Sequence, residues 1–310
     1  MYKKILVPLD TSKLAEVALP YAEELAAKLG SEVILIHVGT LADGADKSDH
    51  SIYINKMVAA TERKIKKSPA LPPGEKVKVT PVILGSPGII TNPPEEILDY
   101  AVKENIDLII MATHGRTGIR RWALGSTANK VARAAQCPLL LIRARSDMPR
   151  SVRLDKILVP LDGSKPGEAV LPYIENIASR LKSKISLLIV VEPPYHVYPY
   201  AEGAGYYGVA GVVRVPYTEE ELKPFMEVAE KYIKGVNDGL SARGIRTSYE
   251  IRTGSPGEEI IEEEAEQHPD MVAMSTHGHS GFGRWDHGNV ADKVLHGGNT
   301  PLLLVRPPRS

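Results

Sequence analysis

Two glycines and a serine in the first half of the chain have residue types and a spacing that suit phosphate groups. Gly115 and Gly125 allow the backbone to approach a ligand closely, and a helix predicted to begin at Ser126 presents unpaired N–H groups and the positive end of its dipole. That dipole stabilises an anion by only about 0.3–2 kcal/mol, so several amide hydrogen bonds must add to it. Asp10 follows an apolar run and offers a carboxylate to a ribose or a base edge. Taken singly, Asp10 is better explained as a helix cap and the glycines as turns.

These residues belong to a sequence that occurs twice. KILVPLD at residues 4–10 returns at 156–162, THG at 113–115 returns at 276–278, and PLLL at 138–141 returns at 301–304. Two units of this length are too few and too large for a solenoid, so the repeat indicates a tandem duplication of a whole domain. We therefore predict domains at residues 1–146 and 152–310, with an exposed linker around 144–154.

Within each copy, short apolar runs alternate with amphipathic stretches. In the first copy, residues 5–9, 33–38, 77–84, 108–112 and 139–142 predict strands, and residues 15–29, 52–67, 95–104 and 126–135 predict helices. Ser12 is a suitable N-cap for the first helix, and Gly30 ends it. This alternation predicts an α/β fold of two tandem Rossmann-like domains, each a five-stranded parallel sheet with helices on both faces. Pro81 removes a hydrogen-bond donor from its strand, which places that strand at a sheet edge.

The candidate site residues follow from this architecture. In an open α/β sheet, ligands bind at the carboxyl ends of the strands, where the strand order reverses. In the first copy these ends are the turns after the first, second and fourth strands. Their residues are Pro8, Leu9 and Asp10, then Val38, and then Ala112, His114, Gly115, Arg116, Gly118, Gly125, Ser126 and Thr127.

Taken together, these residues resemble the universal stress protein family, in a tandem two-domain form, over nearly the whole chain. Nucleotide-binding members of that family carry Gly-x2-Gly-x9-Gly-Ser/Thr after the fourth strand, and the first copy reads Ala112-x2-Gly115-x9-Gly125-Ser126. The resemblance implies that Asp10 and Val38 contact adenosine and that the glycine-rich loop holds the phosphates. It also implies the strand order 3-2-1-4-5, and ATP as the ligand, or AMP or ADP in its place, with or without Mg²⁺.

The second copy departs further from the family pattern. Its matching residues are Pro160, Asp162 and Val190 for adenosine, and Ser275-x2-Gly278-x9-Gly288-Asn289, followed by Val290, for the loop. The leading glycine is replaced by a small residue in both copies, so we expect weaker binding and not exclusion. The charge also falls, because Arg116 and Arg120 correspond to His279 and Gly283. The first copy is therefore the expected nucleotide site, and the second copy is left open.

The expected function is binding of an adenine nucleotide in a stress response, with the bound nucleotide biasing conformation or the choice of partner. Two alternatives stay open: a nucleotide-free interaction module of the same family, and a slow ATP-hydrolysing enzyme. The sequence fixes no nucleophile, and neither half has a Gly-x4-Gly-Lys-Ser/Thr loop, so we assign no catalytic residue. The histidines of the second copy match no closed zinc motif, and we predict no metal site.

Composition limits the remaining classes. The 310 residues carry 38 basic and 38 acidic side chains, so the charge gives no reason to expect nucleic-acid or membrane binding. The single cysteine, Cys137, excludes an internal disulfide framework, and the sequence shows neither a signal peptide nor an apolar run of spanning length, which predicts a cytoplasmic protein. The resemblance implies that residues 139–142 pair with 302–305 in an intramolecular pseudo-dimer, and it leaves a homodimer of whole chains open.

Residues 193–217 have no counterpart in the first copy. They hold six of the chain's 13 tyrosines amid glycines and prolines. This composition predicts a long loop, which is either a mobile surface segment or a lid or interface, because tyrosine is costly to leave in water.

Overall fold

The structure is a computed structural model that describes residues 1–39, 47–85, 91–113, 124–143, 152–202, 209–278 and 289–308. The first half alternates strands and helices, and the predicted α/β character is confirmed. Its elements are β1 (Lys4–Pro8), the 3-10 helix η1 (Ala15–Ala18), α1 (Leu19–Leu29), β2 (Glu32–Val38), α2 (Lys47–Lys67), β3 (Val79–Leu84), α3 (Pro93–Lys103), β4 (Leu108–Ala112), α4 (Ser126–Ala134) and β5 (Leu139–Ile142).

The second half repeats this order with one insertion after its second strand. Its elements are β6 (Lys156–Leu161), the 3-10 helix η3 (Gly167–Val170), α5 (Leu171–Leu181), β7 (Lys184–Val191), β8 (Tyr195–Glu202), β9 (Val209–Pro216), α6 (Glu219–Ala242), β10 (Arg246–Thr253), α7 (Pro256–Gln267), β11 (Met271–Ser275), α8 (Asn289–Gly297) and β12 (Leu302–Val305). Residues 144–151 of the predicted linker lie outside the described residues. Val152 and Leu154 are buried in the larger apolar cluster, so the expectation of an exposed linker was wrong for this part. Among the helices that the structure describes, none has the length and apolar character needed to cross a membrane.

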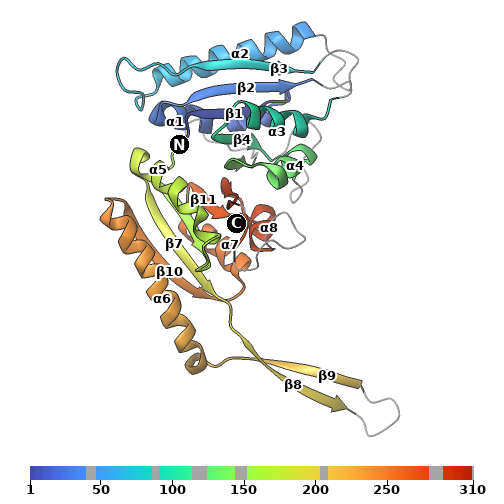
Figure 1. Ribbon diagram of the computed structural model, residues 1–310, viewed down its shortest axis with the longest axis vertical. Coiled ribbons are helices and arrows are strands. Elements are labelled where there is room, and N and C mark those ends of the chain that lie inside the picture. The colour runs from blue at the N-terminus through green and yellow to red at the C-terminus, as the bar shows by residue number, and fades with distance from the viewer. Residues whose placement is uncertain are drawn as a thin grey trace.

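Ten strands form one sheet, in the order β10-β7-β6-β11-β12-β5-β4-β1-β2-β3 (Figure 1). Each half is parallel and has the strand order 3-2-1-4-5 that the resemblance implied. The halves join through β12 and β5, which run antiparallel with Leu303 opposite Leu140. The pairing expected between residues 139–142 and 302–305 is therefore confirmed. β3, which contains Pro81, lies at one end of the sheet as predicted.

A short local motif follows the first strand of each half. Ser12 Oγ accepts a hydrogen bond from Ala15 N at 3.1 Å, and Ser164 Oγ accepts one from Gly167 N at 3.0 Å. Each serine thus bonds the first N–H group of a 3-10 helix whose N-cap residue is Leu14 or Pro166, and α1 and α5 begin only after this short helix. Ser12 was expected to cap the α-helix itself. This expectation was wrong, because the short 3-10 helix η1 lies between Ser12 and α1. Gly30 ends α1 in the left-handed conformation, with φ of 70°, as predicted.

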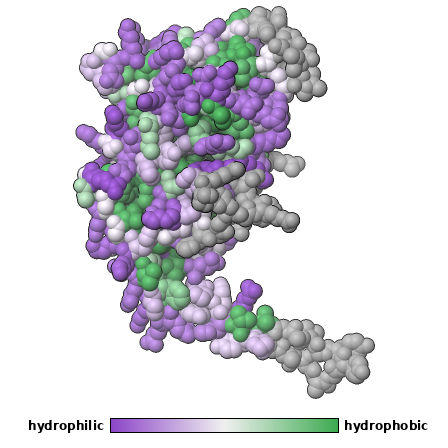
Figure 2. All heavy atoms as spheres, viewed as in Figure 1, coloured by the Kyte–Doolittle hydropathy of each residue, from purple (hydrophilic) through white to green (hydrophobic). Residues whose placement is uncertain are grey.

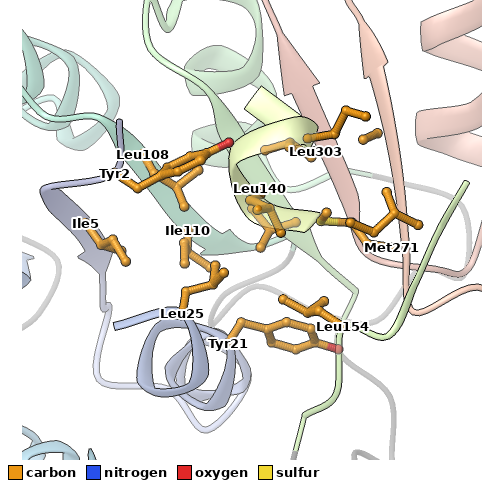
Figure 3. Packing of buried hydrophobic residues seen from close by; sticks show 14 of the residues in the cluster. Tyr2, Ile5, Tyr21, Leu25, Leu108, Ile110, Leu140, Leu154, Met271 and Leu303 are labelled. Carbon is orange, nitrogen blue, oxygen red and sulfur yellow. The ribbon is translucent and has the colours of Figure 1, made fainter. Parts of the chain in front are cut away.

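Helices pack on both faces of the sheet, and the larger apolar cluster contains residues of both halves. Figure 3 shows Leu140 and Leu303, from the two joined strands, within this cluster. Tyr2 is fully buried there, and its hydroxyl donates a hydrogen bond to the carbonyl of Tyr173 at 3.3 Å. Arg143, just after β5, donates hydrogen bonds to two carbonyls near the end of α8, at 2.7 and 3.0 Å. The two halves are therefore held together by buried apolar contacts as well as by the sheet.

The tyrosine-rich insertion is not a loop. β8 and β9 pair antiparallel and form a separate two-stranded sheet, called the arm below, which projects away from the ten-stranded sheet (Figure 1). The prolines and glycines of this stretch indicated turns, but both strands of a two-stranded sheet are edges, where proline is tolerated. The expectation of a long loop was therefore wrong.

Candidate functional site

A cavity of about 690 Å³ opens at the carboxyl ends of β6, β7 and β11 in the second half. Small-molecule sites commonly have volumes of about 300–1,000 Å³, and this is where ligands bind in open α/β sheets. Six of the nine residues predicted for the second copy line the cavity: Pro160, Asp162, Val190, Ser275, Gly278 and Val290. Of the other three, His279 and Gly288 lie outside the described residues, and Asn289 is described only through its backbone, as the first residue of α8.

The turn after β6 fixes the carboxylate of Asp162. Its Oδ1 accepts hydrogen bonds from Ser164 N at 3.0 Å and from Ser164 Oγ at 2.7 Å. Asp10 of the first half is held in the same way by Ser12, at 3.0 and 2.5 Å. The serines, and not the aspartates, bond the first N–H groups of the short helices that follow, so helix capping does not by itself account for the aspartates. An ionised carboxylate accepts about four hydrogen bonds, which gives Asp162 the capacity to accept a ligand hydroxyl as well.

Two glycines enclose that carboxylate. A Cβ atom on Gly278 would overlap Asp162 Oδ2, and a Cβ atom on Gly167 would overlap Asp162 Oδ1. Only glycine at position 278 therefore lets the turn after β11 pass this close to the aspartate. This is the close backbone approach that the glycine spacing predicted.

The polar turn after β11 is itself buried. Ser275, Thr276 and His277 are each less than a tenth exposed, and Thr276 Oγ1 lies 2.9 Å from His277 Nδ1. Ser275 Oγ accepts a hydrogen bond from His277 N at 3.4 Å, so the side chain that replaces the family's leading glycine is bonded within the turn. In the described part of the chain, no three or more His, Cys, Asp or Glu side chains are grouped so that they could hold a metal ion.

Helix α6 supplies a wall of the cavity that the sequence did not predict. Phe225, Val228, Ala229 and Tyr232 line it, opposite residues of β7 and α7. Most of these side chains are apolar, as in sites that hold the flat face of a base. One signal in the sequence could have located this wall. In each half, the helix after the second strand has a tyrosine close to the glutamate that follows the site aspartate by six residues. These pairs are Tyr53 with Glu16 in the first half and Tyr232 with Glu168 in the second.

Tyr232 is the polar residue of that wall. Its hydroxyl oxygen is buried and lies beside the Glu168 carboxylate. Burial, followed by the nearby Glu168 carboxylate, raises the pKa of Tyr232, so the hydroxyl stays protonated and is a donor. Tyr232 therefore places a hydroxyl donor on the cavity wall.

The first-half candidates lie at the corresponding places in the fold. Pro8 ends β1, Leu9 is buried after it, Val38 ends β2, and Ala112 is buried at the end of β4. Gly125 N donates a hydrogen bond to Thr113 O at 2.8 Å, and α4 begins directly after Gly125, with Ser126 and Thr127. The remaining candidates of this loop, His114, Gly115, Arg116 and Gly118, lie outside the described residues.

The two halves differ beside their second strands. In the first half His37 is buried, its Nδ1 lies 2.8 Å from Leu9 O, and its ring meets the ring of His50 from α2 with centroids 4.4 Å apart. The corresponding residue of β7 is Ile189, and the cavity wall beside it contains Ala229. This region is therefore lined by imidazoles in the first half and by smaller or apolar side chains in the second. The cavity described above lies in the second half, and residues 114–123 of the loop that the sequence favoured in the first half lie outside the described residues.

Comparison with known proteins gives a consistent result for both halves. The model of the universal stress protein family matches residues 1–143 and 153–306. Universal stress protein MJ0577 of Methanocaldococcus jannaschii is 30% identical over 158 residues, which are 47% of this chain and 98% of that protein. Universal stress protein MJ0531 of the same organism is 33% identical over 150 residues, 46% of this chain and 83% of that protein. The crystal structure of a universal stress protein from Archaeoglobus fulgidus covers 99% of this chain and 99% of its own, with a TM-score of 0.64 and 18% identity, which shows a shared fold.

Proposed function

The chain belongs to the universal stress protein family, and from this premise we propose that it binds an adenine nucleotide at the cavity of its second half and at the equivalent place in its first half. One observation carries the proposal. Six residues that the motif comparison selected from three separate segments of the chain converge on one cavity of suitable size. The proposed ligand is ATP, and AMP and ADP are the alternatives to compare with it.

The cavity meets the separate requirements of the parts of a nucleotide. Val190 and the apolar residues of α6 and α7 supply a surface for the base, and Asp162 supplies an acceptor for the ribose hydroxyls. Gly278 brings the main chain toward the phosphates, and the first turn of α8 supplies N–H groups and a favourable dipole. Tyr232 adds a hydroxyl donor beside the ribose acceptor.

A bound nucleotide would also contact the helix that carries the arm. Phe225 lines the cavity, its ring packs edge to face on Tyr217 at 6.2 Å, and Tyr217 stacks on His196 of β8 at 4.4 Å. A ligand that fixes the position of Phe225 therefore also affects the base of the arm, because Phe225 contacts Tyr217 and Tyr217 contacts His196. This chain of contacts supports a role in which the nucleotide changes the choice of partner, as part of a stress response.

The test is calorimetry and thermal shift with ATP, ADP and AMP in the presence of magnesium, on the wild-type chain and on three variants. Asp162→Ala and Asp10→Ala each remove one charge-assisted hydrogen bond, so the affinity of the altered half falls about 10- to 100-fold while the other half binds normally. Asp238→Ala is the matched control, because this exposed aspartate of α6 pairs with Lys234 and does not line the cavity. Absence of heat and of a thermal shift with the wild type, and of nucleotide in the purified protein, overturns the proposal.

The arm favours a second candidate, the nucleotide-free interaction module. Its exposed apolar side chains suit protein contacts whether or not a nucleotide is bound. The two candidates differ in what the Asp162→Ala variant does to partner binding. The nucleotide-dependent function predicts that partner binding changes when ATP is added and that Asp162→Ala abolishes this change, whereas the interaction module predicts no effect of ATP.

A further inference from the structure

The arm and the helix beside it carry most of the exposed apolar side chains of the described chain. Eleven large apolar residues are exposed in that part, and eight of them lie here. Six are on the arm and two on α6: Tyr195, Val197, Tyr198, Val212, Val213 and Val215, then Phe225 and Val228. Figure 2 shows the arm extending from the body, with apolar residues on its visible side. Such concentration on one feature marks an interaction site.

Both faces of the arm are apolar. Directly opposed residues of antiparallel strands lie on the same face, so the pair Tyr198 and Val213 shares one face with Val215. The other face carries Tyr195, Val197 and Val212. A sheet with one solvated face normally has polar residues on that face, and this arm does not follow that pattern. Each face is therefore suited to burial against another surface.

Contacts at its base fix the direction of the arm. His196 Nε2 lies 2.9 Å from Glu221 Oε1, and the His196 ring stacks on Tyr217. Thr218 and Glu221 form a capping box at the start of α6, directly after the arm. These contacts direct the arm away from its own sheet (Figure 1), and among the described residues none of the arm lines the cavity. The described residues of its own chain leave both faces of the arm exposed, so these faces can be covered by another molecule.

We propose that this molecule is a second copy of the same chain, and that two copies exchange their arms across a two-fold axis. An isologous interface of this kind requires two complementary patches on one chain, because each contact is made twice. The second patch is Phe225 and Val228 at the rim of the cavity, which are 45% and 71% exposed. Each arm lies on this rim of the other copy.

The size and charge of the patches fit a stable dimer. A two-stranded hairpin of eight residues measures roughly 27 Å by 10 Å on each face. Two exchanged arms and the surfaces that they cover therefore bury on the order of 1,000 Å² through one face and 2,000 Å² through both, which brackets standard interfaces. Arg214 lies on the face with Val197 and Val212, so it points away from a partner surface that is covered by the Val213 face. The formal net charge of zero adds no overall repulsion between copies.

Sedimentation equilibrium without added nucleotide tests this proposal, so its outcome is independent of the proposed ligand. The wild type is expected at twice the chain mass of 33.8 kDa. Val213→Glu places a charge on the more apolar face of the arm and weakens the dimer by at least about 100-fold. Val102→Glu is the control, because Val102 is exposed to 60%, against 46% for Val213, but lies on α3, and this variant stays dimeric. A monomeric wild type, or a Val213→Glu variant as dimeric as the wild type, overturns the proposal.

A cross-link tests where the arm lies. Val213→Cys and Val228→Cys are made in separate chains, mixed and oxidised, and the expected product is a disulfide-linked pair that forms only in the mixture. The native thiol interferes little, since burial raises the pKa of Cys137 to about 11. A dimer that gives no cross-linked product in the mixture shows that the arm does not lie on the partner's α6, and it overturns the proposed exchange.

Discussion

Replacing Gly278 by alanine tests whether the turn after β11 must approach the aspartate this closely. The added Cβ would overlap Asp162 Oδ2 and lie 3.0 Å from Asp162 Cγ, so the carboxylate must move. Moving it weakens the two hydrogen bonds from Ser164. Overpacking of this kind costs about 1–3 kcal/mol of folding free energy. The displaced carboxylate also loses its bond to the ligand, which lowers nucleotide affinity about 10- to 100-fold.

The assay combines calorimetric unfolding with nucleotide titration on the same preparations. The Tm of Gly278→Ala falls by roughly 2–4 °C for each kcal/mol lost. Gly235→Ala is the matched control, because Gly235 lies inside α6 with no atom within 4 Å of an added Cβ. The same change there stabilises the helix by about 0.5–1 kcal/mol and leaves affinity unaltered. If Gly278→Ala has wild-type stability and wild-type affinity, the glycine does not hold the carboxylate in place and the assigned geometry is wrong.

Three further predictions follow from individual side chains. Tyr232→Phe removes a hydroxyl that lies beside the Glu168 carboxylate on the cavity wall, so ATP affinity falls about 3- to 10-fold, while stability measured by urea unfolding changes by about 1 kcal/mol or less; equal affinity would remove Tyr232 from the site. Leu303→Ala opens a cavity where the two halves join and lowers the free energy of unfolding by about 2–5 kcal/mol in the same urea assay, and a loss below 1 kcal/mol would contradict the packing (Figure 3). Cys137, whose pKa burial raises to about 11, reacts with iodoacetamide at pH 8 roughly 100-fold slower than an exposed thiol and faster as the pH rises toward 11; rapid alkylation of the folded protein at pH 8 would contradict its burial.

The ten-stranded core could be predicted because each copy repeats one pattern and the pattern is strong. Continuous apolar runs such as residues 108–112 and 139–142 allow only a sheet covered on both faces, and their observed bounds match the expected ones. Pro81 lacks a backbone N–H group, and this alone predicted that its strand, β3, lies at an edge of the sheet. The arm escaped prediction because its strands bury neither face within the chain. Because neither face is buried, polar and apolar residues do not alternate along these strands, and the prolines of the segment predict turns instead.

The candidate site was predicted where it depends on the chain's local geometry and missed where it depends on packing between distant elements. Asp162 and Gly278 follow strands directly, so their meeting at the sheet edge could be expected from topology. Tyr232 and Phe225 reach the same cavity only because α6 packs across β7, which no spacing along the chain specifies. His50 in the first half and Ala229 in the second shape their surroundings as much as the glycines do.

The tandem arrangement limits where two whole chains can meet. β5 and β12 pair with each other, so this strand edge is used within the chain. The two edges that remain at the ends of the sheet are poor templates, because β3 contains Pro81 and β10 carries Arg246, Glu250 and Arg252. Charged and proline-containing edges discourage pairing with another chain. The second copy nevertheless has an insertion whose exposed valines and tyrosines, among the side chains that the structure describes, lie on both faces of the arm. Exposing such residues gives no benefit to an isolated chain, and this asymmetry between closed sheet edges and an open arm is the strongest support for arm exchange.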